Sequence, residues 1–174
     1  HGLAVDTAGM IVQPARFDTV TYGKRYVDDQ EAPRLDFGFF NERSEDTDAA
    51  VLSHLRLAVE QCDAVIFNQQ VPGGLSEAFI AGLNALFDAC EGRIVLCDAR
   101  HYGARFRQVC RKTNDAEAAR LDGAGPGPMA HPALPELEAF AAGLYAASGK
   151  PVFVTRGARG ILTAADTGLH LAPG

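Results

Sequence analysis

The chain is poor in positive charge. Its 174 residues carry 16 Lys and Arg against 22 Asp and Glu, which gives a formal net charge of −6. A protein that binds nucleic acid usually needs a strongly basic face to displace counterions from the phosphates. We therefore expect no nucleic-acid partner, and we expect the partners to be small.

The chain also lacks paired cysteines and long apolar runs. The spacing of its four cysteines does not match a zinc site, so we interpret them as reduced core residues: Cys62, Cys90, Cys97 and Cys110. No apolar run approaches the about 20 residues of a membrane span, and no charged and then apolar leader opens the sequence. We expect a cytoplasmic protein with no membrane partner.

The composition that remains is ordinary for a globular domain. With 47% hydrophobic and 22% charged residues, the chain can bury one sizeable core. Residues 9–38 differ from the rest, because short β-prone runs surround the turn-prone pair Asp28-Asp29, and Arg34-Leu35-Asp36-Phe37 then alternates polar and apolar residues. This segment is predicted to form a small antiparallel sheet.

Helical and strand patterns alternate from residue 48 onward. Helices are predicted over 48–61, 75–90 and 135–149, a short helix is predicted from Thr113 or Asn114, and strands over 64–67, 93–98, 108–112 and 151–155 lie between them. A Gly- and Pro-rich loop over 122–135 and a hairpin over 161–171 complete the pattern. Such alternation predicts an α/β fold with a parallel sheet.

Polar clusters follow three of the predicted strands. They are Asn68-Gln69-Gln70, Asp98-Ala99-Arg100-His101 and Thr155-Arg156-Gly157, and Asn114 and Glu117 accompany them. In sheets of this kind, ligands bind in the crevice beyond the carboxyl ends of the strands. The clusters therefore predict a binding cleft at this edge.

Several of these residues allow two interpretations. Asn114 followed three residues later by Glu117 is an ordinary helix-capping arrangement, but the same spacing can place both side chains at one phosphate-metal site. Asp98 is either an indirect partner of a metal or a cap at the strand end. A basic stretch could attract a polyanion or form a solvated surface, and it consists of Arg100, Arg105, Arg107, Arg111 and Lys112.

Two motifs carry a family resemblance. Asn114-Asp115-Ala116-Glu117 and, one helix later, Thr155-Arg156-Gly157-Ala158-Arg159-Gly160 match the Asn-x-x-Glu and Thr-x-Gly-x-x-Gly motifs of the ribokinase-like (PfkB-type) carbohydrate kinases. The chain resembles this family over essentially its whole length. Val5-Asp6-Thr7 and Arg34-Leu35-Asp36-Phe37 look most like sugar kinases of the heptose-phosphate kinase type.

The resemblance implies a fold and a division of the chain. The expected fold is a three-layer, mostly parallel sheet flanked by helices, with a small β lid. Residues 9–38 would form this lid, cover the substrate and contact a second subunit in a homodimer. Residues 1–8 and 39–174 would form an α/β nucleotide-binding core that is incomplete.

The resemblance also implies a reaction. The family transfers a phosphoryl group from ATP, with Mg²⁺, to a hydroxyl group of a sugar or sugar phosphate. The implied nucleotide-binding residues are Asn114, Glu117, Thr155, Arg156, Gly157 and Gly160. Glu117 would hold the magnesium through water, and glycine would let the backbone approach the phosphates.

One family motif has no match. The Gly-Ala-Gly-Asp segment, which supplies the anion hole and the base in the family, does not occur in these residues. Asp166 is not a substitute, because it precedes Thr167-Gly168 in a predicted hairpin turn. We assign no catalytic residue and expect a chain truncated at both ends that is inactive or nearly so by itself. The alternatives are a nucleotide-binding module without turnover and a scaffold whose motif residues serve as caps.

Overall fold

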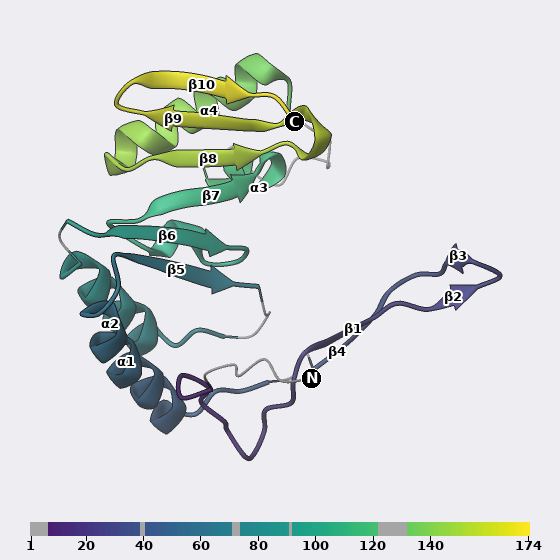
Figure 1. Cartoon of the computed structure of the whole chain (residues 1–174), viewed down its shortest axis with the longest axis vertical. Helices are drawn as coiled ribbons and strands as arrows, with labels where there is room; N and C mark the ends of the chain where they lie inside the picture. Colours follow the sequence, from purple (N-terminus) through teal and green to yellow (C-terminus); the bar gives the residue numbers. More distant parts are fainter. Residues whose placement is uncertain (1–6, 39–40, 71–73, 91, 122–131) are drawn as a thin grey trace.

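A six-stranded sheet forms the centre of the molecule (Figure 1). The computed structural model describes residues 7–38, 41–70, 74–90, 92–121 and 132–174. The sheet has the order β10-β9-β8-β7-β6-β5, and its strands are β5 (Ala64–Gln69), β6 (Ile94–Ala99), β7 (Cys110–Asn114), β8 (Val152–Thr155), β9 (Ile161–Ala165) and β10 (Gly168–Ala172). Strands β5 to β8 are parallel, and β9 and β10 add an antiparallel hairpin. The predicted mostly parallel α/β sheet is confirmed.

Four α-helices accompany the sheet within the described ranges. They are α1 (Glu45–Val59), α2 (Glu77–Asp88), α3 (Asp115–Leu121) and α4 (Leu134–Ser148). Ser44 caps α1 by accepting a hydrogen bond from the backbone N–H of Thr47 (3.1 Å), and Ser76 caps α2 in the same way. Among the described residues, no helix is long and apolar enough to span a bilayer. Val5, Asp6 and most of the predicted loop over 122–135 lie outside the described residues.

Both pairs of helices pack on one face of the sheet. Val95 and Cys97 of β6 are buried against α2 and α1, while Val152 and Val154 of β8 are buried with α3 and α4. The strand register aligns Cys97 with Arg111 and Arg111 with Val152, so these residues share a face. The described residues therefore supply the sheet and one helix layer of the expected three-layer arrangement.

The second face of the sheet is open in the described part of the chain. Ile66 of β5 is 72% exposed and Ile94 of β6 is 62% exposed, and both point away from the helix layer. Towards the carboxyl ends of the strands this open face changes from apolar to polar. The residues that make it polar are Asn68, Asp98, Lys112, Asn114 and Thr155.

A narrow β arm projects from the core (Figure 1). It consists of β1 (Thr21–Gly23), β2 (Tyr26–Val27), β3 (Gln30–Glu31) and β4 (Leu35–Phe37), with β1 paired to β4 and β2 paired to β3. Asp28 and Asp29 both adopt positive φ, as a tight hairpin turn requires. The turn predicted at this pair is therefore confirmed. Leu35 and Phe37 are 54% and 57% exposed on the arm.

Candidate functional site

The two sequence motifs lie side by side at the carboxyl edge of the sheet. Asn114 ends β7, Thr155 ends β8, and the strand register pairs these two residues directly. Residues paired in this way on neighbouring parallel strands have side chains on the same face. The structure therefore brings together the Asn-x-x-Glu and Thr-x-Gly-x-x-Gly segments, which are about 40 residues apart in the sequence.

Asn114 and Glu117 cap the start of α3 reciprocally. The backbone N–H of Glu117 donates to Oδ1 of Asn114 at 2.8 Å, and the backbone N–H of Asn114 donates to Oε2 of Glu117 at 2.9 Å. The capping interpretation of this spacing is thus realised. An ionised carboxylate has about four acceptor positions, so one capping bond leaves Glu117 able to hold a metal-bound water as well.

The Thr155–Gly160 segment forms a tight turn after β8. The hydroxyl of Thr155 donates to the carbonyl of Thr113 (3.1 Å), and the backbone N–H of Arg156 donates to the carbonyl of Gly160 (2.9 Å). Between these ends, the 3₁₀ turn η2 (Gly157–Arg159) brings the chain back into β9. The backbone of this turn is therefore held at both ends.

The two glycines of this turn, Gly157 and Gly160, have different surroundings. Gly157 has a φ of +59°, and a Cβ added there would meet no atom within 4 Å. Gly160 has a φ of +87°, and a Cβ there would collide with the carbonyl oxygen of Ala172 and the backbone that follows it. Gly157 therefore presents open backbone on which a phosphate could lie, while Gly160 is needed for packing against the end of the chain.

Arg156 folds back onto its own turn. Its Nη1 donates to the carbonyl of Arg159 at 3.4 Å, and its Nε is buried without a hydrogen-bond partner in the part of the chain that the structure describes. A buried guanidinium N–H without an acceptor costs free energy. A phosphate oxygen at this turn would supply such an acceptor.

An ion pair that the sequence did not suggest joins the two motifs. Nη2 of Arg159 donates to Oδ2 of Asp115 at 2.8 Å, and the Asp115 side chain is almost fully buried. Asp115 is the first residue of α3, so this contact ties the turn after β8 to the helix that follows β7. The sequence did not predict this ion pair, because Asp115 and Arg159 are far apart in the chain and meet only in the folded protein.

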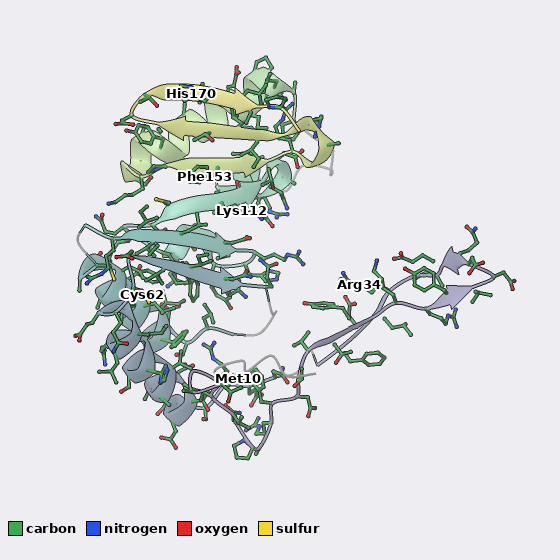
Figure 2. The ribbon with its side chains drawn as sticks, in the orientation of Figure 1. Met10, Arg34, Cys62, Lys112, Phe153 and His170 are labelled. Carbon is green, nitrogen blue, oxygen red and sulfur yellow. The ribbon has the colours of Figure 1, made fainter. Side chains whose placement is uncertain are left out.

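A second charged pair lies on the open face. Nζ of Lys112 donates to Oδ2 of Asp98 at 2.8 Å, across the neighbouring ends of β7 and β6. Figure 2 shows Lys112 on the sheet, well away from Arg34 on the β arm. Asp98 thus has a cationic partner in this structure, and sequence reasoning placed Lys112 only within a basic stretch.

The polar cluster Asn68-Gln69-Gln70 at the end of β5 lines a separate cavity of about 240 Å³ at the base of the β arm. Its walls combine aromatic rings with polar side chains, among them Phe17, Phe67, Phe79, Arg43, Asn68 and Gln70. The guanidinium of Arg43 stacks on the ring of Phe79 at 4.2 Å and pairs with Asp48 at 2.8 Å. The residues that line this cavity do not include the turn after β8.

A preformed metal centre is not found among the described residues, where no group of three His, Cys, Asp or Glu side chains converges. Magnesium commonly retains waters and uses one or two carboxylates together with substrate phosphates. Glu117 fits that role because its carboxylate lies at the strand edge and is half-buried. It would hold the metal only in the presence of the nucleotide phosphates.

Comparison with known proteins supports the fold and leaves the chemistry open. No protein-family model matches the sequence, and no curated protein matches it. Phosphofructokinase-2 from Escherichia coli, in complex with fructose-6-phosphate, aligns at 14% identity with a TM-score of 0.56, over 81% of this chain and 46% of that one.

Two further solved structures align over more of the chain. A PfkB protein from Polaromonas sp. JS666 is 15% identical with a TM-score of 0.58, over 92% of this chain and 55% of that one. The protein Sa239 is 15% identical with a TM-score of 0.65, over 92% of this chain and 50% of that one. The chain has a ribokinase-like fold and spans about half the length of the structures it resembles.

Proposed function

We propose that the chain carries the nucleotide-binding part of a PfkB-type sugar kinase, which transfers a phosphoryl group from ATP to a hydroxyl group of a sugar or sugar phosphate. One observation carries the proposal: the Asn114–Glu117 and Thr155–Gly160 segments meet at the carboxyl edge of a ribokinase-like sheet. Ligands of open α/β sheets bind at this edge. The kinase neighbours support the reaction class.

Each motif residue has a role consistent with its surroundings. Gly157 leaves open backbone for the nucleotide phosphates, and Arg156 gains an acceptor for its buried Nε. Thr155 and Asn114 fix the two strand ends, and Glu117 orders the hydrated metal. Bound Mg·ATP supplies the transferable phosphoryl group and neutralises its charge. The residues of this chain hold the phosphates and the metal in position, and such positioning is the main contribution of a protein to phosphoryl transfer.

We propose that the acceptor sugar binds in the cavity at the base of the β arm. Its aromatic walls suit the apolar faces of a sugar ring, while Arg43, Asn68 and Gln70 offer polar atoms for hydroxyl groups. The sequence resemblance favours a phosphorylated sugar of the heptose-phosphate type. We propose that the β arm acts as the lid of this region and pairs with the arm of a second subunit, which would bury Leu35 and Phe37, both exposed in this chain.

The described residues offer no base for the acceptor hydroxyl. Asp166 lies at the tip of the β9–β10 hairpin, where its Oδ1 accepts a hydrogen bond from the backbone N–H of Thr167 at 2.9 Å. It is thus used by its own turn and is remote from the carboxyl edge of β7. We expect these 174 residues to bind Mg·ATP without efficient turnover.

A non-catalytic module is the second candidate, and the reciprocal capping of α3 favours it. The side chains of Asn114 and Glu117 each accept a hydrogen bond from the backbone N–H of the other residue, so helix capping alone explains both residues. A scaffold of this kind would not bind Mg·ATP. A nucleotide-binding module would bind it without turnover even within a longer chain.

Calorimetric titration of the chain with Mg·ATP tests the proposal. We expect saturable binding that Gly157→Val weakens by about tenfold or more, since its side chain would occupy the space meant for a phosphate. Gly168→Val is the matched control, because Gly168 also has a positive φ and an open surrounding, but lies at the distant β9–β10 turn. Equal weakening by both variants, or no binding by folded wild type, would refute the proposed nucleotide site.

A further inference from the structure

The basic stretch predicted from the sequence is largely neutralised in the fold. Arg105 pairs with Glu77 at 2.5 Å, Arg107 pairs with Asp88 at 2.8 Å, and Lys112 pairs with Asp98. Arg111 is mostly buried and donates from Nη2 to the carbonyl of Phe106 at 2.6 Å. Burial lowers the pKa of Arg111 from its ordinary value. These four residues are therefore committed to the protein itself.

Arg100 is the exception. It follows β6, its side chain is exposed, and it makes no ion pair within the described ranges of the chain. Arg120, from the last turn of α3, is exposed and equally without an ion pair there. Both guanidinium groups are therefore available to an anionic ligand.

Both arginines line one cavity of about 300 Å³, between the segment after β6 and α3. His101, Arg105 and Glu117 also line it, and Glu117 is the only acidic residue among the described residues of the lining. Glu77 offsets the positive charge of Arg105 through their ion pair. The negative charge of Glu117 offsets the charge of one of the two remaining arginines. The described lining therefore keeps a net positive charge of about one.

We propose that this cavity is a binding site for a phosphoryl group, held by Arg100 and Arg120 with His101 beside them. Guanidinium groups match the oxygens of a phosphate in planar, charge-assisted pairs, and His101 adds a further donor. A phosphate anion would offset the excess charge of the lining. The site differs from the proposed nucleotide site, because it lies on the β6 side of α3, whereas the turn after β8 lies on the other side.

The phosphoryl group has two possible sources with the same chemistry. It belongs either to a separate phosphorylated small molecule or to the phosphate chain of a nucleotide that extends past Glu117 from the neighbouring site. Glu117 borders both locations, so occupancy of one affects the charge felt at the other. The inference does not depend on the nucleotide site being real.

Titration of the chain with inorganic phosphate at constant ionic strength, with chloride as the replacement anion, tests this site. We expect saturable binding that Arg100→Gln and Arg120→Gln each weaken by about tenfold or more, since each change removes a charge-assisted contact. Arg107→Gln is the matched control, because Arg107 is exposed, belongs to the same basic stretch and lies outside the cavity lining. Its affinity for phosphate should equal that of wild type.

Failure of this inference is distinct from failure of the proposed function. Glu117→Gln should tighten phosphate binding, because it removes an acidic group from the lining, while the proposed function expects it to weaken Mg·ATP binding. No saturable phosphate binding by the folded chain, or equal weakening in Arg107→Gln, would overturn the site. If saturating ADP competes with phosphate, the group belongs to the nucleotide; if both bind together, it belongs to a separate molecule. Either result supports a phosphoryl site.

Discussion

Replacing Gly160 with alanine should destabilise the fold much more than replacing Gly157, although both glycines belong to one motif. Gly160 has φ +87° and ψ −152°, a region that essentially only glycine occupies, so a side chain there costs about 2 kcal/mol in backbone strain. The added Cβ would also collide with Ala172, Pro173 and Gly174. These neighbours are backbone atoms that cannot rotate away, and such overpacking costs about 2 kcal/mol more.

The Gly157 substitution has only one of these costs. Its φ of +59° lies in the left-handed helical region, where alanine is disfavoured by about 1 kcal/mol, and open space surrounds its Cα. For a chain of this size, about 1 kcal/mol corresponds to about 2–4 °C in the unfolding midpoint. We expect Gly157→Ala to lower the midpoint by about 2–4 °C and Gly160→Ala to lower it by about 8 °C or more.

Thermal unfolding followed by circular dichroism, without nucleotide, measures this difference. Urea unfolding of the same proteins gives the free energies directly. If the two variants unfold at the same temperature, or if Gly160→Ala matches wild type, then the contact between the turn after β8 and the end of β10 is wrong. That result would also contradict the open surroundings that the structure gives the backbone of Gly157.

Further substitutions test other parts of the account. Asn114→Ala should lower the free energy of urea unfolding by about 1 kcal/mol, because α3 loses its N-cap, and an unchanged value would contradict the capping contact. Arg159→Gln should destabilise the chain by about 1 kcal/mol by removing a partly exposed partner of the buried Asp115, and an additional Asp115→Asn change should then add less than it does alone. Burial raises the pKa of Cys97 from 9.0 to about 12, so the unfolded chain releases this proton at lower pH than the folded chain. The free energy of unfolding should therefore fall above pH 9, by up to about 1.4 kcal/mol per pH unit, and Cys97→Ala should reduce that slope. Phe37→Ser should shift the expected dimer towards monomer in sedimentation, and a wild-type chain that is only monomeric would exclude dimerisation through the β arm.

The fold was predictable where the pattern was local. Apolar runs such as Ala64–Phe67 and Ile94–Cys97 predict strands, which the structure confirms, although Ile66 and Ile94 are exposed in the described part of the chain. Ser44 and Ser76 mark helix starts because their side chains accept hydrogen bonds from backbone N–H groups three residues later. The pair Asp28-Asp29 likewise sets its own turn. Such signals depend on neighbours in the sequence, so the sequence alone contains them.

The candidate site was predictable only in part, for the same reason. Asn114 and Glu117 are three residues apart and form a visible motif, whereas Asp115 meets Arg159 only after β7 and β8 have paired. The pairing of Asp98 with Lys112 likewise depends on the register of two strands. The ion pairs of the basic stretch also depend on the tertiary fold, because partners such as Glu77 lie on another element. The sequence alone therefore does not show which of these basic residues are neutralised.

Glu117 offers the most direct test of the central claim, because glutamine at this position keeps the helix cap and removes the charge that a metal needs. Glu136 is a matched control: it caps α4 in the same way, accepting from the backbone N–H of Ala133 at 2.9 Å, and lies on a different helix. The measurement is calorimetric titration with ATP, with and without Mg²⁺, for wild type, Glu117→Gln and Glu136→Gln. The account predicts magnesium-dependent binding that Glu117→Gln weakens by about tenfold or more and Glu136→Gln leaves unchanged. Binding that is the same in all three proteins, or absent from folded wild type, would contradict a magnesium-nucleotide site at Glu117 and leave the motif as a helix cap.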